Sequence, residues 1–297
     1  MDIQQSPLYI QYIQLLNWTV ITVDDIHILI KKIPLLGGLA KIQRCQTLPA
    51  LNKLIPLLKT HNIRTVAIEP ASNVHQEVFT AYCKELKKYF KLNASPFLPT
   101  KTILVDIQSK EDEIFQRFTE TKRRAVRRAQ KNIIVIKESN DINDLIDIKN
   151  KSAGLFGFIT TYGLQALWKI FAPSHAAILL ASHLESFRKA SPCIMQGEAL
   201  CNSKTVGGIL LLFYGKTAHY WIAGATQEGK KLFAPTLLVW EALKRSKKRG
   251  CKQFDFVGAW DERLSTQNLE WKGFTKFKEG FGGTAQYYPI INSLVRR

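Results

Sequence analysis

The chain is poor in the residues that build disulfides, metal sites and membrane spans. Its five cysteines among 297 residues are odd in number and scattered, with no C-x-x-C pair, and no histidines cluster at zinc-ligand spacing. We therefore expect reduced thiols and no metal. The longest apolar runs, 209–213 and 176–181, fall far short of the roughly 20 residues that a membrane span needs.

The start of the chain, residues 1–16, also lacks the basic region, apolar core and small-residue cleavage site of a secretory signal. These absences together predict a cytoplasmic protein without a transmembrane segment. Contact with the inner face of the membrane is expected to be peripheral if it occurs.

Acidic residues are scarce relative to basic ones. The chain has 24 acidic and 42 basic residues, which gives a formal charge of +18 and an isoelectric point near 9.7. Such an excess favours polyanionic partners: nucleic acid, anionic lipid headgroups or phosphorylated substrates. The glycine fingerprints of Walker and Rossmann nucleotide sites are absent as well, so no redox cofactor is implied.

Helical and strand patterns alternate along the chain, which predicts an α+β protein with mixed sheets. The length suits two domains, and a polar stretch at 139–144 places the expected division at 1–140 and 141–297, with the last residues able to pack back on the first domain. Expected helices are 50–60, 75–90, 111–131, 140–152, 161–171, 174–190 and 235–249. Expected strands are 65–70, 101–107, 193–201, 253–259 and a hairpin over 205–226 that turns at 214–216.

The segment 111–131 has the clearest amphipathic pattern. At about 100° per residue its apolar side chains share one arc, with Lys122 near the edge. The opposite side carries a cationic face of Arg123, Arg124, Arg127, Arg128 and Lys131. Arginine suits bidentate phosphate binding, so this face is a candidate polyanion site. The alternative is an ordinary solvated face.

Three acidic residues stand at or near the ends of predicted strands: Glu69, Asp106 and Asp255. A carboxylate in this place can act as a general base, and it can equally cap the turn that follows. Both roles remain open for Asp106.

The segment 273–283 combines four glycines with three phenylalanines and three charged residues. Its spacing is too irregular for a helix face or a strand, which predicts a glycine-rich loop. A lysine held there between an aromatic side chain and a glycine turn, as Lys278 is, can stabilise a developing oxyanion. The alternative is a C-terminal hairpin with ordinary surface lysines.

In their order and spacing, several segments resemble the FemABX family of peptidoglycan-bridge aminoacyltransferases. The matching segments are 65–70, 101–107, 121–131, 219–226, 233–250, 253–260 and 273–283. The resemblance implies two fused GNAT-like domains with a cleft between them. It also implies transfer of an amino acid from aminoacyl-tRNA to an amine of a peptidoglycan precursor, either nucleotide-linked or lipid-linked. No long helical insertion interrupts the second half, so the chain is similar to members without a coiled-coil arm.

The same resemblance implies roles for individual residues. Lys278 would stabilise the oxyanion or the leaving group, and Asp106 would lie near the acceptor amine. Lys41 and Arg44 would bind the precursor's diphosphate, Tyr220 would line the peptide channel, and Glu69 counts among the substrate-binding residues. An aminoacyl ester is already activated, so no cofactor is expected beyond the aminoacyl-tRNA itself.

Two other functions compete with this one. An acyl-CoA-dependent GNAT enzyme would carry a glycine-rich loop at a helix start to bind the CoA diphosphate. The corresponding stretch, 227–235, has only Gly229, followed by bulky side chains. A non-catalytic RNA-binding protein would use the 122–131 face and would not need Lys278 or Asp106.

Overall fold

The computed structural model describes residues 2–33, 37–153, 161–184, 203–264 and 267–291. The chain forms two compact units, each assembled from separate stretches. Unit 1 comprises residues 1–102, 258–275 and 285–297, and unit 2 comprises residues 103–257 and 276–284. The boundary expected between residues 140 and 141 falls inside unit 2.

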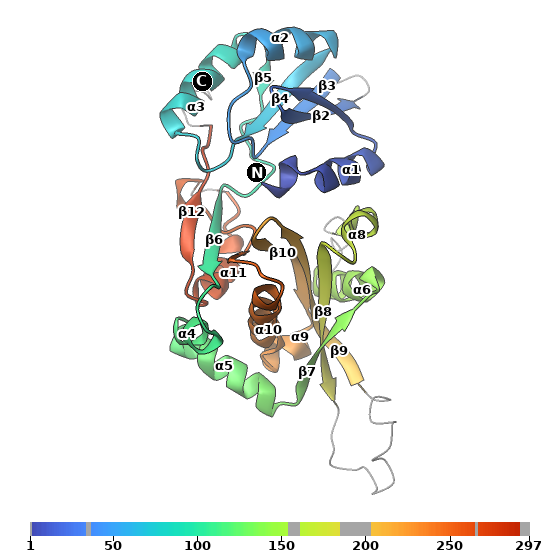
Figure 1. Cartoon of the computed structure of the whole chain (residues 1–297), viewed down its shortest axis with the longest axis vertical. Helices are drawn as coiled ribbons and strands as arrows, with labels where there is room; N and C mark the ends of the chain where they lie inside the picture. The colour runs from blue at the N-terminus through green and yellow to red at the C-terminus, as the bar shows by residue number, and fades with distance from the viewer. Residues whose placement is uncertain (1, 34–36, 154–160, 185–202, 265–266, 292–297) are drawn as a thin grey trace, which may run out of the picture. The chain divides into compact units, whose positions relative to one another are not determined.

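Unit 1 is built on a five-stranded mixed sheet in the order β1-β2-β3-β4-β5. The first three strands are antiparallel neighbours, and β3, β4 and β5 are parallel (Figure 1). Its strands are β1 (Thr19–Val23), β2 (Ile26–Ile33), β3 (Gly37–Gln43), β4 (Ile63–Glu69) and β5 (Lys91–Leu92). Its helices are the 3-10 helix η1 (Ile3–Gln5), α1 (Pro7–Leu15), α2 (Leu51–Thr60) and α3 (Gln76–Lys87), with a short 3-10 helix η5 (Glu262–Leu264) from the later stretch.

The core of unit 1 lies between this sheet and helices α2 and α3. Leu54 and Leu58 of α2 and Phe79 and Leu86 of α3 are fully or almost fully buried against the sheet. Cys83 belongs to the same cluster, and burial raises the pKa of its thiol to about 12. Such a thiol is packed as a small apolar side chain and is chemically inert.

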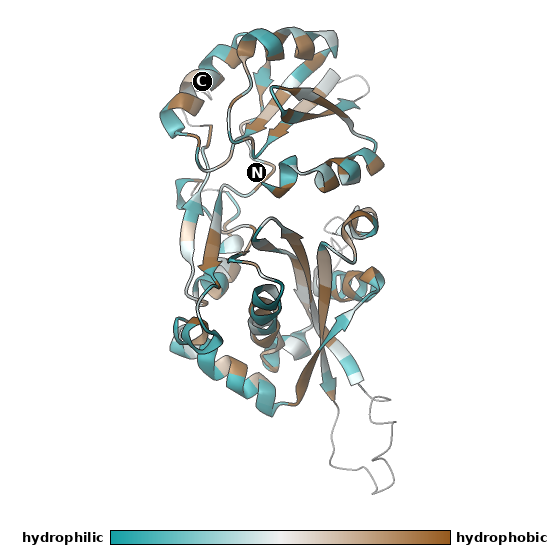
Figure 2. Cartoon of the chain, in the orientation of Figure 1, coloured by the Kyte–Doolittle hydropathy of each residue, from teal (hydrophilic) through white to brown (hydrophobic). Residues whose placement is uncertain are grey.

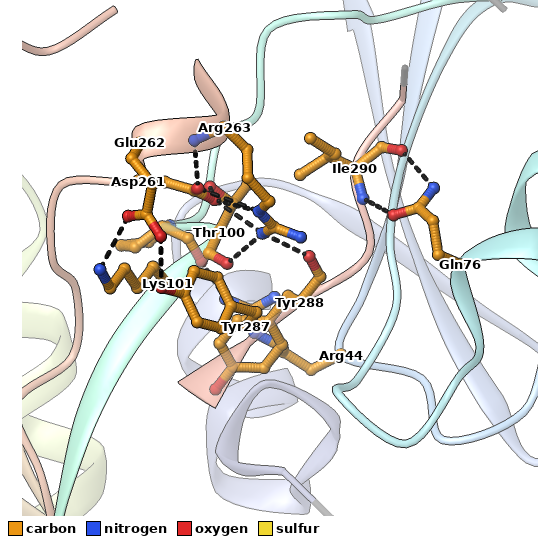
Figure 3. Close-up of polar contacts among 11 residues, drawn as sticks. Arg44, Gln76, Thr100, Lys101, Asp261, Glu262, Arg263, Tyr287, Tyr288 and Ile290 are labelled. Atoms are coloured by element: carbon orange, nitrogen blue, oxygen red, sulfur yellow. Dashed lines mark hydrogen bonds and ion pairs between the residues drawn. The ribbon is translucent and has the colours of Figure 1, made fainter. Parts of the chain in front are cut away.

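The C-terminal stretches of unit 1 are held by a polar network around Arg263 (Figure 3). Its guanidinium donates to the Asp261 carboxylate at 2.7 Å, to the Thr100 carbonyl at 3.1 Å and to the Tyr288 carbonyl at 2.9 Å. Burial works to raise the pKa of Asp261, but the hydrogen bonds from Arg263 and Thr100 hold it below its ordinary value. Because a buried carboxylate is stable only when its oxygens are satisfied, this network fixes residues 258–264 on the N-terminal part of the same unit.

Unit 2 contains most of a seven-stranded mixed sheet in the order β12-β6-β11-β10-β9-β8-β7. Its strands are β6 (Lys101–Asp106), β7 (Ile134–Ser139), β8 (Ala176–Leu184), β9 (Ser203–Tyr214), β10 (Thr217–Ala225), β11 (Gln253–Asp255) and β12 (Thr284–Tyr287). The division between the units falls within β6, β12 and the helix at Trp271–Glu279. The helices around it are α4 (Glu111–Gln116), α5 (Glu120–Lys131), α6 (Ile142–Ala153), α8 (Leu164–Phe171), α9 (Gln227–Lys231), α10 (Ala234–Lys248) and α11 (Trp271–Glu279).

Helix α10 packs on strands β8 to β10, and α6 packs on β9 and β10. The middle strands are therefore apolar along nearly their whole length, and β8 and β9 appear largely brown in Figure 2. Residues 206–213 of β9 are buried without interruption. A strand covered by helices on its two faces has no need for the polar–apolar alternation of a half-exposed strand.

Strands β10 and β11 are paired over only three residues. The parallel register joins Thr217–His219 to Gln253–Asp255, after which β11 ends and the Phe256 N–H bonds to the Ile103 carbonyl of β6. Strand β10 continues to Ala225 beside β9, with a register shift between Tyr220 and Ile222. The two strands therefore separate beyond the His219–Asp255 pair, and the sheet has a gap between β10 and β11 from that point.

Three sequence expectations were wrong in detail. The expected helix 111–131 is two helices, α4 and α5, with the break at 117–119. The expected helix 174–190 begins instead as strand β8, because its apolar run is buried on both faces of the sheet. The expected loop 273–283 is helical through Glu279. The strand expected at 193–201 lies outside the described residues.

An aromatic cluster closes the core of unit 2 around Phe118, which is 1% exposed. Its ring centroid lies 5.0 Å from that of Phe281 and 5.5 Å from that of Trp240.

We expect Phe118→Ala to lower the free energy of unfolding by about 3–5 kcal/mol, because it leaves a cavity among rings that cannot collapse. Urea unfolding measures this change. Tyr162→Ala, at a side chain 73% exposed, should change stability by less than about 0.5 kcal/mol, and equal losses in the two variants would contradict the packing.

Candidate active site

Lys278 lies buried where strands β10 and β11 part. It is on the last turn of α11 and is 8% exposed. Its Nζ donates a hydrogen bond to the Phe256 carbonyl at 2.9 Å and lies 5.7 Å from the centroid of the Tyr220 ring. Burial lowers the pKa of this amine to about 8, and the nearby Asp255 opposes the shift. At neutral pH the lysine can therefore carry a positive charge and also release it within reach of physiological conditions.

A buried pair, His219 and Asp255, stands beside Lys278. His219 Nδ1 lies 3.5 Å from Asp255 Oδ2, and both residues are 9% exposed. The other carboxylate oxygen of Asp255 accepts the Val257 N–H at 2.8 Å. Of this pair, only Asp255 was a candidate from the sequence. Only the strand register, which sets His219 opposite Asp255, brings them together.

The surroundings of Lys278 are aromatic. The Tyr220 ring centroid lies 5.5 Å from that of Phe256 and 6.2 Å from that of Phe254, and Phe256 lies 5.6 Å from Phe281. Burial also raises the pKa of the Tyr220 hydroxyl, so the tyrosine stays neutral. Because these rings exclude water, a charge on Lys278 acts at a low local dielectric constant.

The turn after α11 is packed against the break between α4 and α5. The Thr119 N–H donates to the Gly280 carbonyl at 2.9 Å, and the stem of Lys122 lies on Gly280. Gly282 has a φ of 77°, and a Cβ there would stand 2.5 Å from the Arg117 carbonyl. Gly282 is therefore required for close backbone approach, and the approach sets the position of the helix end that carries Lys278.

Lys122 is a second lysine in an apolar setting, and the sequence had placed it only at the edge of the apolar arc. Its Nζ lies 3.7 Å from the centroid of the Phe277 ring and 5.3 Å from that of Phe281. Burial lowers the pKa of the Lys122 amine to about 8. Through these contacts Lys122 ties the start of α5 to α11.

Asp106 ends strand β6 and is exposed. Its carboxylate accepts the Gln108 backbone N–H at 2.9 Å, and this hydrogen bond is the main cause that lowers the pKa of Asp106. Of the two roles left open by the sequence, the structure displays the turn cap. A role near the acceptor amine stays a prediction.

The cationic face of α5 divides into two parts. Arg123 donates to the Gln116 and Phe118 carbonyls at the end of α4, and Arg124 pairs with Glu120. The remaining side chains are Arg127, Arg128 and Lys131, all exposed toward the C-terminal end of the helix. Arg123 therefore stabilises the break between the helices, and the other end of the face presents the accessible positive charge.

In unit 1, Arg44 and Glu69 make internal contacts. Arg44 is 5% exposed, donates to the Pro99 carbonyl at 2.6 Å and stacks 3.4 Å from the Tyr288 ring centroid. Glu69 accepts the Leu98 N–H at 2.7 Å and the Gln43 amide at 3.1 Å. These contacts position the segment 93–100. Substrate binding by either residue stays a prediction.

Lys41, also in unit 1, faces aromatic rings. Its Nζ lies 3.7 Å from the Phe97 ring centroid and 4.8 Å from that of Trp18, and burial lowers the pKa of the amine. Phe97 also lines a cavity of about 150 Å³ whose walls include Trp260, Trp271 and Asp261. No sequence pattern indicates this cavity, because its walls come from stretches more than 150 residues apart.

The mixed sheets flanked by helices agree with the comparisons to known proteins. Residues 116–273, more than half of the chain, match the family model of the acetyltransferase (GNAT) domain. The chain belongs to that family, and its fold is that of a FemABX-like tandem GNAT protein. None of the curated proteins matches the chain in sequence.

Solved structures show the same fold. The structure of FemX superposes with a TM-score of 0.69 at 17% identity, covering 97% of this chain and 90% of FemX. The C-terminal domain of a putative lysylphosphatidylglycerol synthetase from Agrobacterium fabrum gives 0.57 at 11% identity, covering 98% and 90%. L-PGS from Bacillus licheniformis gives 0.51 at 10% identity, covering 93% and 83%. None of the helices in the described ranges is long and apolar enough to cross a membrane.

The buried lysine predicts a pH-dependent stability. The unfolded chain binds the Lys278 proton at the ordinary pKa, and the folded chain binds it only near pH 8. Between pH 8 and the ordinary lysine pKa of 10.5, the unfolded chain therefore binds more protons than the folded chain. Across this window the unfolding free energy should rise with pH, by on the order of 3 kcal/mol from this one group. Lys278→Met removes the contribution, so the stability of the wild type relative to this variant should rise across the window. Denaturant unfolding of both proteins at several pH values measures this difference. If the unfolding free energies of the wild type and the variant changed in parallel with pH, the burial of Lys278 would be contradicted.

Proposed function

We propose that this GNAT-fold acyltransferase transfers an aminoacyl group from tRNA to an amine of a peptidoglycan precursor. The observation that carries the proposal is Lys278: a buried, aromatic-walled amine at the place where two strands of a GNAT sheet part. The sequence resemblance to FemABX enzymes and the fold shared with FemX support this donor and this acceptor.

The reaction needs alignment and charge stabilisation. The acceptor amine attacks the ester carbonyl carbon, the C–O bond to the tRNA ribose breaks, and the amine's proton ends on the departing hydroxyl. Negative charge develops on the carbonyl oxygen and then on the leaving oxygen. In its cationic form Lys278 can donate a hydrogen bond to either, and in a dry site such a bond is worth far more than in water.

Asp255 and His219 would control the charge of Lys278. The carboxylate favours the ammonium form of the lysine. One of its oxygens is fixed by the Val257 N–H, and the other lies 3.5 Å from His219 Nδ1. Strand pairing sets His219 and Asp255, and α11 with the hydrogen bond to the Phe256 carbonyl sets Lys278. All three groups are therefore in place before substrate binds, which preorganises the site.

The donor would be recognised by charge. The exposed end of the cationic face, Arg127, Arg128 and Lys131, suits phosphates of a nucleic acid backbone. In unit 1, Lys41 and the cavity beside Phe97 offer a cation, aromatic rings and polar groups to the acceptor. We assign donor binding to unit 2 and acceptor binding to unit 1.

An acyl-CoA donor is the second candidate, and the GNAT family match favours it. The structure of the loop where CoA phosphates would bind does not. Gly229 is packed so closely that a Cβ would stand 2.2 Å from the Val206 carbonyl, and its N–H is bonded to the Thr226 hydroxyl at 3.1 Å. This glycine is explained by packing, and the amide that a diphosphate would use already has a partner.

A transfer assay tests the proposal. Purified protein would be incubated with tRNA pools, each charged with one labelled amino acid, and with nucleotide-linked and lipid-linked precursors. We expect label to move to a precursor and the rate to fall about 10²–10³-fold in Lys278→Ala, because one oxyanion donor is lost. Lys276→Ala, an exposed lysine two residues away, should retain the rate within about twofold. Transfer from acyl-CoA alone would overturn the tRNA donor and establish the second candidate.

The tRNA-binding role of α5 makes a separate prediction. We expect Arg127→Gln with Arg128→Gln to weaken tRNA binding and to reduce the slope of log affinity against log salt by about 1.5–2, because two phosphate contacts are lost. Filter binding at several salt concentrations measures the slope. Lys87→Gln with Lys91→Gln removes the same charge from unit 1 and should leave the slope unchanged. An equal change of slope in the two double variants would mean that tRNA is attracted by the net charge of the protein and not by the α5 face.

A further inference from the structure

A second basic surface lies in unit 1, away from the residues assigned to the reaction. It gathers where α2 and α3 end and strand β5 begins (Figure 1). We call it the lysine–tyrosine surface, and its members are Lys59, Lys84, Lys87, Lys88, Tyr89 and Lys91. All six are exposed. The Tyr89 side chain is 51% exposed, and Lys59 Nζ lies 4.9 Å from its ring centroid.

A shallow hollow adjoins these lysines. Its volume is about 570 Å³, with Lys87, Lys88, Tyr89 and Lys91 among the residues around it. Its remaining lining is apolar: Phe90, Leu92, Ala94 and Ile291. The surface therefore combines lysines around the hollow (the cationic rim), an apolar lining (the apolar floor) and a tyrosine that is half exposed to solvent.

The charge exceeds what the helix ends require. Lysines in the last turns of α2 and α3 offset the partial negative charge of about half an electron at each helix C-terminus. The two helices together need about one positive charge. The surface carries five lysines against one acid, Glu85, which pairs with Lys88 at 2.7 Å. Among the described residues no other carboxylate pairs with these lysines, so about three positive charges remain for a partner.

The chemistry favours a lipid surface over a nucleic acid. Flexible ammonium groups attract a plane of phosphates without fixed geometry, whereas phosphate recognition by arginine is bidentate, and this surface has no arginine among its members. Lysine stems and a tyrosine ring also cover apolar surface while their polar ends stay in water, as at a membrane interface. The apolar floor suits the glycerol and upper chain region of a lipid.

We propose that the lysine–tyrosine surface docks on an anionic phospholipid bilayer and holds the protein peripherally at the membrane. Each lysine contributes electrostatic attraction, and Tyr89 enters the headgroup layer with the apolar floor behind it. This inference does not rest on the transfer reaction and is tested without any substrate.

The experiment is flotation of the full chain with phosphatidylglycerol vesicles, and with neutral phosphatidylcholine vesicles as the lipid control. We expect binding to the anionic vesicles only, weakened by high salt. The triple variant Lys87→Gln, Lys88→Gln and Lys91→Gln should lower the partition coefficient about a hundredfold, because each lysine near an anionic surface contributes about fivefold. Tyr89→Ser should lower it further. Circular dichroism melting would verify that each variant folds.

The matched control is a triple variant of exposed lysines in unit 2: Lys216→Gln, Lys248→Gln and Lys252→Gln. It removes the same charge and should reduce vesicle binding far less than the first triple. Equal losses in the two triples would overturn the proposal, because the net charge would then act without a defined surface. Absence of vesicle binding would overturn it too, as would RNA binding that only the first triple abolishes.

Discussion

The hydrogen bond from the Lys278 ammonium to the Phe256 carbonyl is the contact on which the rest of the site depends. It places a charge among aromatic rings, where an unpaired ammonium would be too costly to keep. The carbonyl is available because the pairing of β11 with β10 ends at Asp255, while the chain continues beside β6. The separation of β10 and β11 thus leaves the Phe256 carbonyl free of a strand partner on that side, and Lys278 binds to it.

The neighbouring elements maintain this arrangement. The turn after α11 can approach the break between α4 and α5 only because Gly282 has no side chain. Arg123 holds the break by bonding to the Gln116 carbonyl of α4 and the Phe118 carbonyl of the break itself. Lys122 joins the start of α5 to the Phe277 ring of α11. The cationic helix is therefore partly a structural support for the helix that carries Lys278, with its exposed end left for a polyanion.

Local signals in the sequence were sufficient where one element decides the structure. The β9–β10 hairpin turns at Gly215, and α10 begins around Pro235 and ends before Gly250, as their turn and capping chemistry predicts. The glycines of 273–283 concealed a helix, because Phe281 gains contacts with Phe118 and Phe256, which lie far from it in the sequence. His219 and Asp255 meet through strand register, which no single segment encodes. Arg44 and Glu69 look like free charges in the sequence, yet folding gives both internal partners.

The most direct test of the account is the titration of Lys278 itself. With carbon-13-labelled lysine, the Cε resonance assigned by comparison with Lys278→Met would report the protonation of this one amine as pH is raised. The account predicts a midpoint near 8, shifted lower still in Asp255→Asn because the opposing carboxylate charge is gone. A midpoint at the ordinary value of a solvated lysine would mean that the amine is in water, and the proposed active site would then have no basis.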